Sequence, residues 1–289
     1  MIKKRSSISD YFSLIKFSHT IFALPFAFIG FLLGAKENNF QFEWKLPVLV
    51  LLCMVFARSA AMAFNRWTDK KIDAKNFRTS TREIPAGKIS ANFALTFVVI
   101  NCVLFIACTF FINRICFFLS PVALIVVLGY SYTKRFTSLS HLVLGLGLSL
   151  APIGAYLAVT GNFNLLPILF SIAVLAWVSG FDIIYALQDI EFDKEQKLKS
   201  IPSKIGIKNS MFASSILHLV ASVVLLLASF YGKFSWIYLC GWGIFSVLLI
   251  YQHTLVKEND LSKVNVAFFT TNGIASIVFA LFTASDLFF

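Results

Sequence analysis

Runs of about twenty apolar residues recur along this chain, and they limit what it can fold into. One run, KLPVLVLLCMVFARSAAMAF at residues 45–64, is followed directly by the polar stretch NRWTDKKIDAKNFRTSTREIPAGKIS at residues 65–90. A helix needs about 20 predominantly apolar residues to cross a bilayer. Only 13% of the residues are charged and the mean hydropathy is +0.80, whereas soluble domains carry about 25% charged residues. The sequence therefore predicts a polytopic membrane protein.

Nine runs are long enough to be candidate spans. In lipid, each segment must satisfy its own backbone hydrogen bonds, so runs of this length are expected to be helices. The expected spans are residues 18–36, 46–66, 93–112, 115–132, 142–160, 165–189, 211–231, 234–253 and 266–286. The first is interpreted as a retained span, because the apolar run lacks a clear signal-peptide cleavage site. The fold class expected is an all-α bundle around a central cavity, with residues 1–289 forming a single intramembrane domain.

Lysine and arginine are distributed unevenly between the connecting segments, although the net charge is +11. The N-terminal segment and the loops after the second, fourth, sixth and eighth spans hold nearly all of them. By the positive-inside rule, the N-terminus and the long basic loops face the cytoplasm and the C-terminus lies outside. A bacterial-type inner membrane is the expected location. Because the charges follow membrane topology, we expect the lipid bilayer, and no nucleic acid, as a partner.

Small residues indicate where helices approach one another closely. The sequence GFLLG places Gly30 and Gly34 on one face of the first span, and GLGLSLAPIGA at residues 145–155 falls in the fifth span. The histidines at positions 141, 218 and 253 are scattered along the sequence and form no metal-ligand set.

The first polar motif stands where an apolar run meets a basic loop. Asn65, Asp69 and Asp73 recur every four residues. On an α-helix this spacing stacks them along one face at about 6 Å per step. An aspartate within a span costs roughly 2.5–3.5 kcal/mol on insertion scales, so such residues usually mark a functional path. Ordinary helix-end charges paired with Lys70 and Lys71 are the structural alternative.

A second motif repeats this pattern at the end of the sixth span, in FDIIYALQDIEFDKEQKLKSIPSKIG at residues 181–206. Asp182, Tyr185, Asp189 and Asp193 are separated by three, four and four residues, so they too are expected to share one helical face. A single aspartate at such a place is explained by solvation or by pairing with a lysine. Two separate faces with the same spacing favour a function.

Two acidic faces beside basic loops indicate a site for Mg²⁺ and a diphosphate. Mg²⁺ commonly binds through a few carboxylates together with substrate phosphates, and arginine contacts phosphate oxygens in a bidentate manner. The candidate metal ligands are Asn65, Asp69, Asp73, Asp189 and Asp193. The candidate diphosphate ligands in the three neighbouring loops are Arg66, Lys70, Arg82, Lys134, Arg135 and Lys199.

Over nearly its whole length the chain resembles the UbiA superfamily of intramembrane prenyltransferases. The two acidic motifs resemble the family's N-x-x-x-D-x-x-x-D and D-x-x-x-D motifs. RTSTREIPAGKIS at residues 78–90 resembles its R-T-x-x-R-P-x-x-x-G segment, and YSYTKRFTSLSHLVLG at residues 130–145 resembles its Y-T-K-R segment, which adds Tyr132 to the candidate diphosphate ligands. Arg66 stands where many members carry a second aspartate, and Glu83-Ile84 separates the usual Arg-Pro pair. Both departures resemble menaquinone-pathway relatives.

The resemblance implies an enzyme that transfers a polyprenyl group from a polyprenyl diphosphate to an aromatic quinone precursor in ubiquinone or menaquinone biosynthesis. The acceptor is expected to be 4-hydroxybenzoate or a dihydroxynaphthoate. Mg²⁺ is the expected cofactor, because it stabilises a leaving diphosphate. Tyr185 is expected to stabilise the allylic cation, and Asp182 to orient or deprotonate the acceptor. Arg78 and Lys16 are the candidates for holding an acceptor carboxylate.

Other classes of membrane protein fit part of this pattern. A secondary transporter also carries intramembrane acids, but near the midplane and in paired repeats, whereas these acids lie at span ends. A structural membrane protein leaves the two matching acidic faces unexplained. A prenyltransferase or cyclase with a non-aromatic acceptor is the nearest alternative among enzymes. The sequence indicates neither the length of the prenyl chain nor the oligomeric state.

Overall fold

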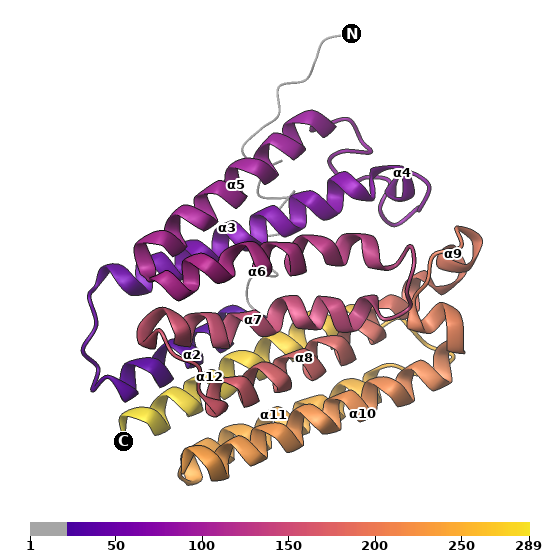
Figure 1. Ribbon diagram of the computed structural model, residues 1–289. Coiled ribbons are helices and arrows are strands. Elements are labelled where there is room, and N and C mark those ends of the chain that lie inside the picture. The colour runs from indigo at the N-terminus through magenta and orange to yellow at the C-terminus, as the bar shows by residue number, and fades with distance from the viewer. Residues whose placement is uncertain (1–21) are drawn as a thin grey trace. The chain divides into compact units, whose positions relative to one another are not determined.

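Residues 22–289 are described by the computed structural model, and apart from one isolated bridge they contain no β-strand (Figure 1). Eight helical segments in this range are long and apolar enough to cross a membrane. They are α3 (Lys45–Thr68), α5 (Ala91–Ile112), α6 (Arg114–Thr133), α7 (Ser140–Thr160), Leu165–Glu195 with α8 (Leu165–Ala186) at its start, α10 (Ile201–Gly232), α11 (Trp236–Leu255) and Val266–Phe288. The expected all-α, multi-pass membrane architecture is confirmed.

The helix boundaries agree with the expected spans from residue 46 onward, with one large exception. α10 begins at Ile201, well before the expected start at 211, because Ser200 and Ser203 cap one another reciprocally. Gly206 breaks this helix with φ 78°, a left-handed conformation that glycine adopts without steric cost. The expected span 18–36 lies partly outside the described residues, and its described part is α2 (Leu24–Glu37).

The described helices fall into two compact units. The small unit is Val48–Tyr132 and contains most of α3, α4 (Lys70–Asp73), α5 and most of α6. The large unit comprises residues 22–47 and 133–289, and contains α2 and all the helices from α7 onward.

Small side chains form the core of the small unit. Ala60 and Ala63 of α3 are fully buried against Ala94 and Val98 of α5. α5 begins with an N-cap, since the Ser90 hydroxyl accepts a hydrogen bond from the N–H of Phe93.

Aromatic side chains form the core of the large unit, in which α7 packs against α2 and α8, α8 against α10, and α11 against α12 (Asn272–Phe288). Trp177 of α8 is fully buried. Its ring centroid lies 5.3 Å from that of Phe26, 5.1 Å from that of Phe181 and 5.7 Å from that of Phe245. These contacts join α2, α8 and α11 around the C-terminal half of α8.

A buried polar network crosses the same core. Trp177 Nε1 donates to Asn272 Oδ1 over 2.8 Å. The Asn272 amide nitrogen donates to the carbonyls of Ala267 and Phe268, which belong to the π-helix η3 (Val266–Thr271). With these two bonds the Asn272 side chain satisfies backbone carbonyls of η3, whose π-helical turn is wider than that of an α-helix.

Two of the histidines that are far apart in the sequence also meet in this core, since His218 Nδ1 lies 2.8 Å from His253 Nε2.

Two glycines allow α2 and α7 to touch. A Cβ atom added to Gly30 would lie 2.7 Å from the carbonyl carbon of Pro152, and one added to Gly34 would lie 2.9 Å from Val159 Cβ. Both distances are shorter than real Cβ contacts. The close helix contact expected from GFLLG is therefore confirmed.

Candidate active site

The first acidic motif continues the helical path of α3 beyond its end. The N–H of Asp69 donates to the carbonyl of Asn65 over 3.0 Å, and the N–H of Asp73 donates to that of Asp69 over 2.7 Å. This is the i to i−4 pattern of an α-helix, and it carries through the turn at Asp69 into α4. These bonds keep the three residues one turn apart, although α3 ends at Thr68 and Asp69 itself has non-helical dihedral angles.

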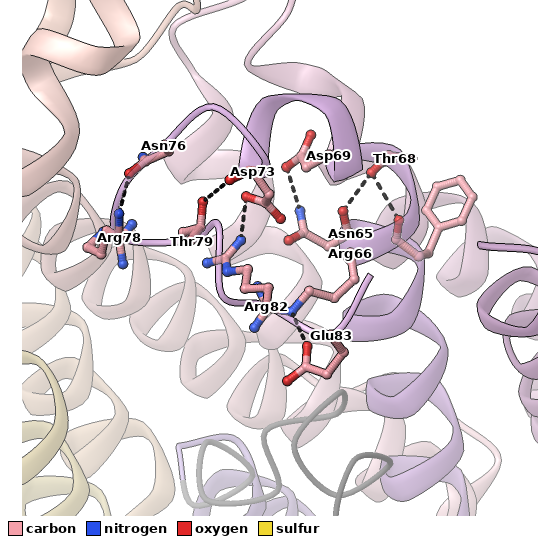
Figure 2. A network of polar contacts seen from close by, with 11 residues as sticks. Asn65, Arg66, Thr68, Asp69, Asp73, Asn76, Arg78, Thr79, Arg82 and Glu83 are labelled. Carbon is pink, nitrogen blue, oxygen red and sulfur yellow. Dashed lines mark hydrogen bonds and ion pairs between the residues drawn. The ribbon is translucent and has the colours of Figure 1, made fainter. Parts of the chain in front are cut away.

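Hydrogen bonds from neighbouring side chains fix the orientation of the Asp69 and Asp73 carboxylates (Figure 2). The amide nitrogen of Asn65 donates to Asp69 Oδ2 over 3.3 Å. Arg82 Nη1 donates to Asp73 Oδ1 over 2.7 Å, and the Thr79 hydroxyl donates to the Asp73 carbonyl over 3.2 Å. The loop after α4 is thus folded back onto the motif.

One carboxylate oxygen of this motif is left unsatisfied by the described residues. Asp73 Oδ2 is buried and has no hydrogen-bond partner among the described residues. Burying such an oxygen unsatisfied costs about 1–3 kcal/mol, and more when it is charged. A hard cation such as Mg²⁺ would satisfy it, and the neighbouring Asn65 and Asp69 carry oxygen donors of the kind that Mg²⁺ prefers. The donor set of this motif therefore fits the expected metal.

The basic residues of the same loop contact acids and aromatic rings. The guanidinium of Arg66 is only 2% exposed, and its Nε lies 3.8 Å from Glu83 Oε2. Lys70 Nζ lies 4.6 Å from the centre of the Trp67 ring, a cation–π distance. The backbone N–H of Arg78 donates to Asn76 Oδ1 in a tight turn (Figure 2). Arg66 and Arg82 are therefore engaged by carboxylates.

A further arginine, Arg58, which belongs to neither acidic motif, lies inside α3. Arg58 precedes Asn65 by seven residues, which is about two helical turns, so both lie on nearly the same face of α3. Its Nε is buried and has no hydrogen-bond partner among the described residues. Tyr130 of α6 is near enough to interact with it electrostatically. A charged residue inside a span usually has a function, and its place within an apolar run was the available signal.

The second acidic motif lies in the large unit on three consecutive segments. Asp182 and Tyr185 belong to α8, Asp189 ends the 3₁₀ turn η2 (Leu187–Asp189), and Asp193 lies in α9 (Ile190–Glu195). A 3₁₀ turn has three residues per turn, so it changes the direction in which the following side chains point. The second motif therefore does not lie on one regular helix, because the 3₁₀ turn η2 stands between α8 and α9.

Asp193 lies near residues of two neighbouring segments. Ser200 is close to its carboxylate, and Lys134 and Asp189 are within electrostatic range of it. The Lys199 N–H donates to the Lys134 carbonyl over 2.7 Å, and Lys199 Nζ donates to the Phe136 carbonyl over 3.1 Å. The loop after α6 and the segment before α10 are thus joined. Four of the expected site residues are brought together here.

The remaining expected site residues lie elsewhere. Arg135 is exposed on the loop after α6. Tyr132 belongs to the small unit, where its ring packs at 5.7 Å against that of Phe64. Lys16 lies outside the described residues. In residues 22–289 no group of three or more His, Cys, Asp or Glu side chains is poised to hold a metal, and the five expected metal ligands divide between the two units.

Asp182 has a partner that the sequence did not indicate. His141 Nδ1 lies 2.7 Å from Asp182 Oδ2, although the two residues are far apart in the sequence. The ring of Tyr185, one turn further along α8, packs at 4.2 Å against the ring of Phe268. The positions of both predicted catalytic side chains are therefore fixed by tertiary contacts.

The sequence of this chain matches one protein family model and several named relatives. The model of the UbiA prenyltransferase family matches residues 23–274. The 4-hydroxybenzoate octaprenyltransferase of Aliivibrio fischeri (strain MJ11) is 29% identical over 253 residues, covering 85% of each chain. The protein of the same name from Tolumonas auensis is 29% identical over 234 residues, covering 81% of this chain and 82% of its own.

Solved structures share the fold. The apo structure of a UbiA homolog from Aeropyrum pernix K1 has a TM-score of 0.79 and 27% identity, and covers 93% of this chain and 97% of its own. A UbiA homolog from Archaeoglobus fulgidus bound to DMAPP and Mg²⁺ has a TM-score of 0.73 and 21% identity, and covers 96% and 99%. The family match spans both units and both acidic motifs, and the chain belongs to the UbiA prenyltransferase family.

Proposed function

We propose that this protein transfers a polyprenyl group from a polyprenyl diphosphate to the ring of 4-hydroxybenzoate in ubiquinone biosynthesis, releasing diphosphate. The observation that carries the proposal is the pair of acidic motifs in a member of the prenyltransferase family. The acceptor follows from relatives named 4-hydroxybenzoate octaprenyltransferase that match over most of the chain. A dihydroxynaphthoate, as in menaquinone biosynthesis, is the second candidate, favoured by the residues at positions 66 and 83.

We further propose that the enzyme depends on Mg²⁺. Bound Mg²⁺ would neutralise the charge that develops on the departing diphosphate. The proposed ligands are Asn65, Asp69 and Asp73 in the first motif, and Asp189 and Asp193 in the second. The partnerless oxygen of Asp73 supports this assignment, as does the homolog of the same fold bound to DMAPP and Mg²⁺.

The diphosphate itself is assigned to the basic loops. Lys134, Arg135 and Lys199 would contact its oxygens from the loop after α6 and the start of α10, with Lys70 and Tyr132 as further donors. Arg66 and Arg82 stay in the proposed set, but both also bind carboxylates of their own loop. Their first role is therefore to hold the acidic motif in shape while they contribute positive charge.

The acceptor is assigned two contacts. A buried arginine needs an anionic partner, and the carboxylate of 4-hydroxybenzoate would supply one to Arg58. Arg78 and Lys16 remain proposed for the same role. Asp182 would accept the hydrogen bond of the acceptor hydroxyl, and the ring face of Tyr185, fixed by Phe268, would stabilise the allylic cation.

In the cell we propose that the protein lies in a bacterial-type inner membrane with its N-terminus and basic loops in the cytoplasm. The uneven distribution of lysine and arginine supports this orientation. Both proposed substrates then reach the site from the cytoplasmic side or from the bilayer.

The test is a prenylation assay on the full chain in membranes with a radiolabelled polyprenyl diphosphate, with Mg²⁺ or with EDTA. The acceptors offered in parallel are 4-hydroxybenzoate and two dihydroxynaphthoates. We expect Mg²⁺-dependent prenylated 4-hydroxybenzoate with an equal amount of diphosphate. Product from a dihydroxynaphthoate alone would replace the proposed acceptor. No diphosphate release from folded protein would reject the enzyme and favour a transporter.

A further inference from the structure

We propose that His141 is a positioning residue for Asp182: it holds one oxygen of that carboxylate so that the other accepts the hydroxyl proton of the acceptor. The inference rests on the proposed function, because it needs an aromatic acceptor with a hydroxyl group. His141 of α7 thereby joins Asp182 of α8 in the part of the site that moves the acceptor's hydroxyl proton.

The contact between the two side chains is short and directional. His141 Nδ1 lies 2.7 Å from Asp182 Oδ2, the length of a charge-assisted hydrogen bond. The His141 side chain is 5% exposed, whereas that of Asp182 is 20% exposed. Among the described residues no other hydrogen bond or ion pair engages Asp182. The histidine is thus the buried, supporting member of the pair, and the aspartate is the reachable one.

The two ring nitrogens of His141 differ in their surroundings. Nε2 is buried and has no hydrogen-bond partner among the described residues. Nδ1 is therefore the ring nitrogen that is engaged, and as a donor it holds Asp182 Oδ2. Asp182 Oδ2 is then committed, and Oδ1 is left to accept a proton.

The backbones that carry this pair approach closely at the same level. The Ser179 hydroxyl of α8 lies 3.2 Å from the His141 carbonyl and 2.7 Å from the Leu175 carbonyl. A Cβ atom added to Gly145 of α7 would lie 2.5 Å from that Leu175 carbonyl oxygen. Both partners therefore stand on packed helices, where their rotamers are fixed more firmly than on loops.

The bond between the allylic carbon and the diphosphate oxygen breaks, and its electron pair leaves with the diphosphate. A π pair of the acceptor ring forms the new carbon–carbon bond, while the hydroxyl proton passes to Asp182 Oδ1. The ring carbon then loses its hydrogen as a proton, and Asp182 returns its proton to the oxygen. One proton and one diphosphate are released, and His141 keeps its own proton throughout.

The test compares four single variants and one double variant of the full chain in membranes, with 4-hydroxybenzoate and a polyprenyl diphosphate as substrates. His141→Leu removes the donor, and His141→Asn returns an N–H near the position of Nδ1. Asp182→Asn removes the charge that the histidine supports. Ser149→Ala is the matched control, a buried polar residue of the same helix whose hydroxyl donates to the Leu146 carbonyl.

We expect His141→Leu to lower kcat/KM for 4-hydroxybenzoate on the order of 10- to 100-fold, with the KM for the prenyl diphosphate unchanged. His141→Asn recovers most of the loss, and Ser149→Ala behaves as wild type. In an Asp182→Asn background, His141→Leu adds less than about threefold, because its partner is already disabled.

Three results would overturn the inference. An active wild type with an unaffected His141→Leu variant rejects the positioning role alone. Equal losses for both substrates, with lowered melting temperatures in the Leu and Asn variants, identify a purely structural histidine. A folded wild type that makes no prenylated product rejects the proposed function, and the positioning role with it.

Discussion

At the residue scale, the two charged residues that depart from the family's motifs form one buried ion pair. Arg66 and Glu83 are both nearly fully buried and lie at ion-pair distance. Removing one partner of a buried pair leaves the other charge uncompensated, whereas removing both is far less costly. We therefore expect Arg66→Met and Glu83→Gln each to lower the free energy of unfolding by about 3 kcal/mol, and the double variant to lose clearly less than the sum.

Thermal unfolding in detergent measures this coupling. Arg135→Met, at an exposed arginine, is the control and is expected to unfold at the wild-type temperature. Strictly additive losses in the double variant would show that the two side chains are not a pair.

Also at this scale, Arg58 is expected to recognise the acceptor carboxylate. A hydrogen bond to a charged group contributes about 1.5–3 kcal/mol, so Arg58→Leu should lower kcat/KM for 4-hydroxybenzoate roughly 10- to 100-fold. The methyl ester of 4-hydroxybenzoate lacks the negative charge and is expected to be used equally by wild type and variant. An equal loss with acid and ester would place the arginine in another role, such as shaping α3.

At the element scale, the glycine contact between α2 and α7 makes a contrasting pair of substitutions available. A Cβ on Gly30 would meet the backbone at Pro152, whereas one on Gly154, also in α7, meets nothing within 4 Å. Gly30→Ala should therefore lower stability by about 1–3 kcal/mol through overpacking. Gly154→Ala should leave stability unchanged or raise it by up to about 1 kcal/mol through helix propensity. Melting temperatures measured side by side check both, and a tolerated Gly30→Ala would contradict the close contact.

The helices themselves were predictable, because a span is defined by the length of an apolar run and needs no partner to be recognised. α10 starts earlier than expected because a polar capping box, rather than hydrophobicity, sets its first residue. The acid spacing predicted the path of the first motif, but the 3₁₀ turn before Asp193 depends on packing at the end of α8. His141 was missed for the same reason, since only the contact of α7 with α8 brings it to Asp182. Arg58, by contrast, was visible as a charge inside an apolar run.

At the scale of the whole molecule, the proposed activity depends on residues from both compact units. The small unit supplies Asn65, Asp69 and Asp73, and the large unit supplies Asp189 and Asp193. The family match runs without interruption through both. Metal dependence is therefore expected to require the acidic residues of both units. A substitution of these residues in either unit should weaken Mg²⁺ binding.

Replacing an aspartate by asparagine tests this metal dependence, because the side chain keeps its shape and loses its charge. Asp69→Asn and Asp189→Asn remove one negative charge each, so both should bind Mg²⁺ more weakly and reduce kcat at least about 100-fold at saturating prenyl diphosphate. Raising Mg²⁺ should recover part of the activity of both, because weaker binding is compensated by concentration. Asp182→Asn should also lower kcat, but with the wild-type Mg²⁺ requirement, because its proposed role is to handle the proton. If Asp69→Asn and Asp189→Asn differed, with only one shifting the Mg²⁺ titration, the metal would be held by one motif, and the other acidic motif would bind the substrate by some other means.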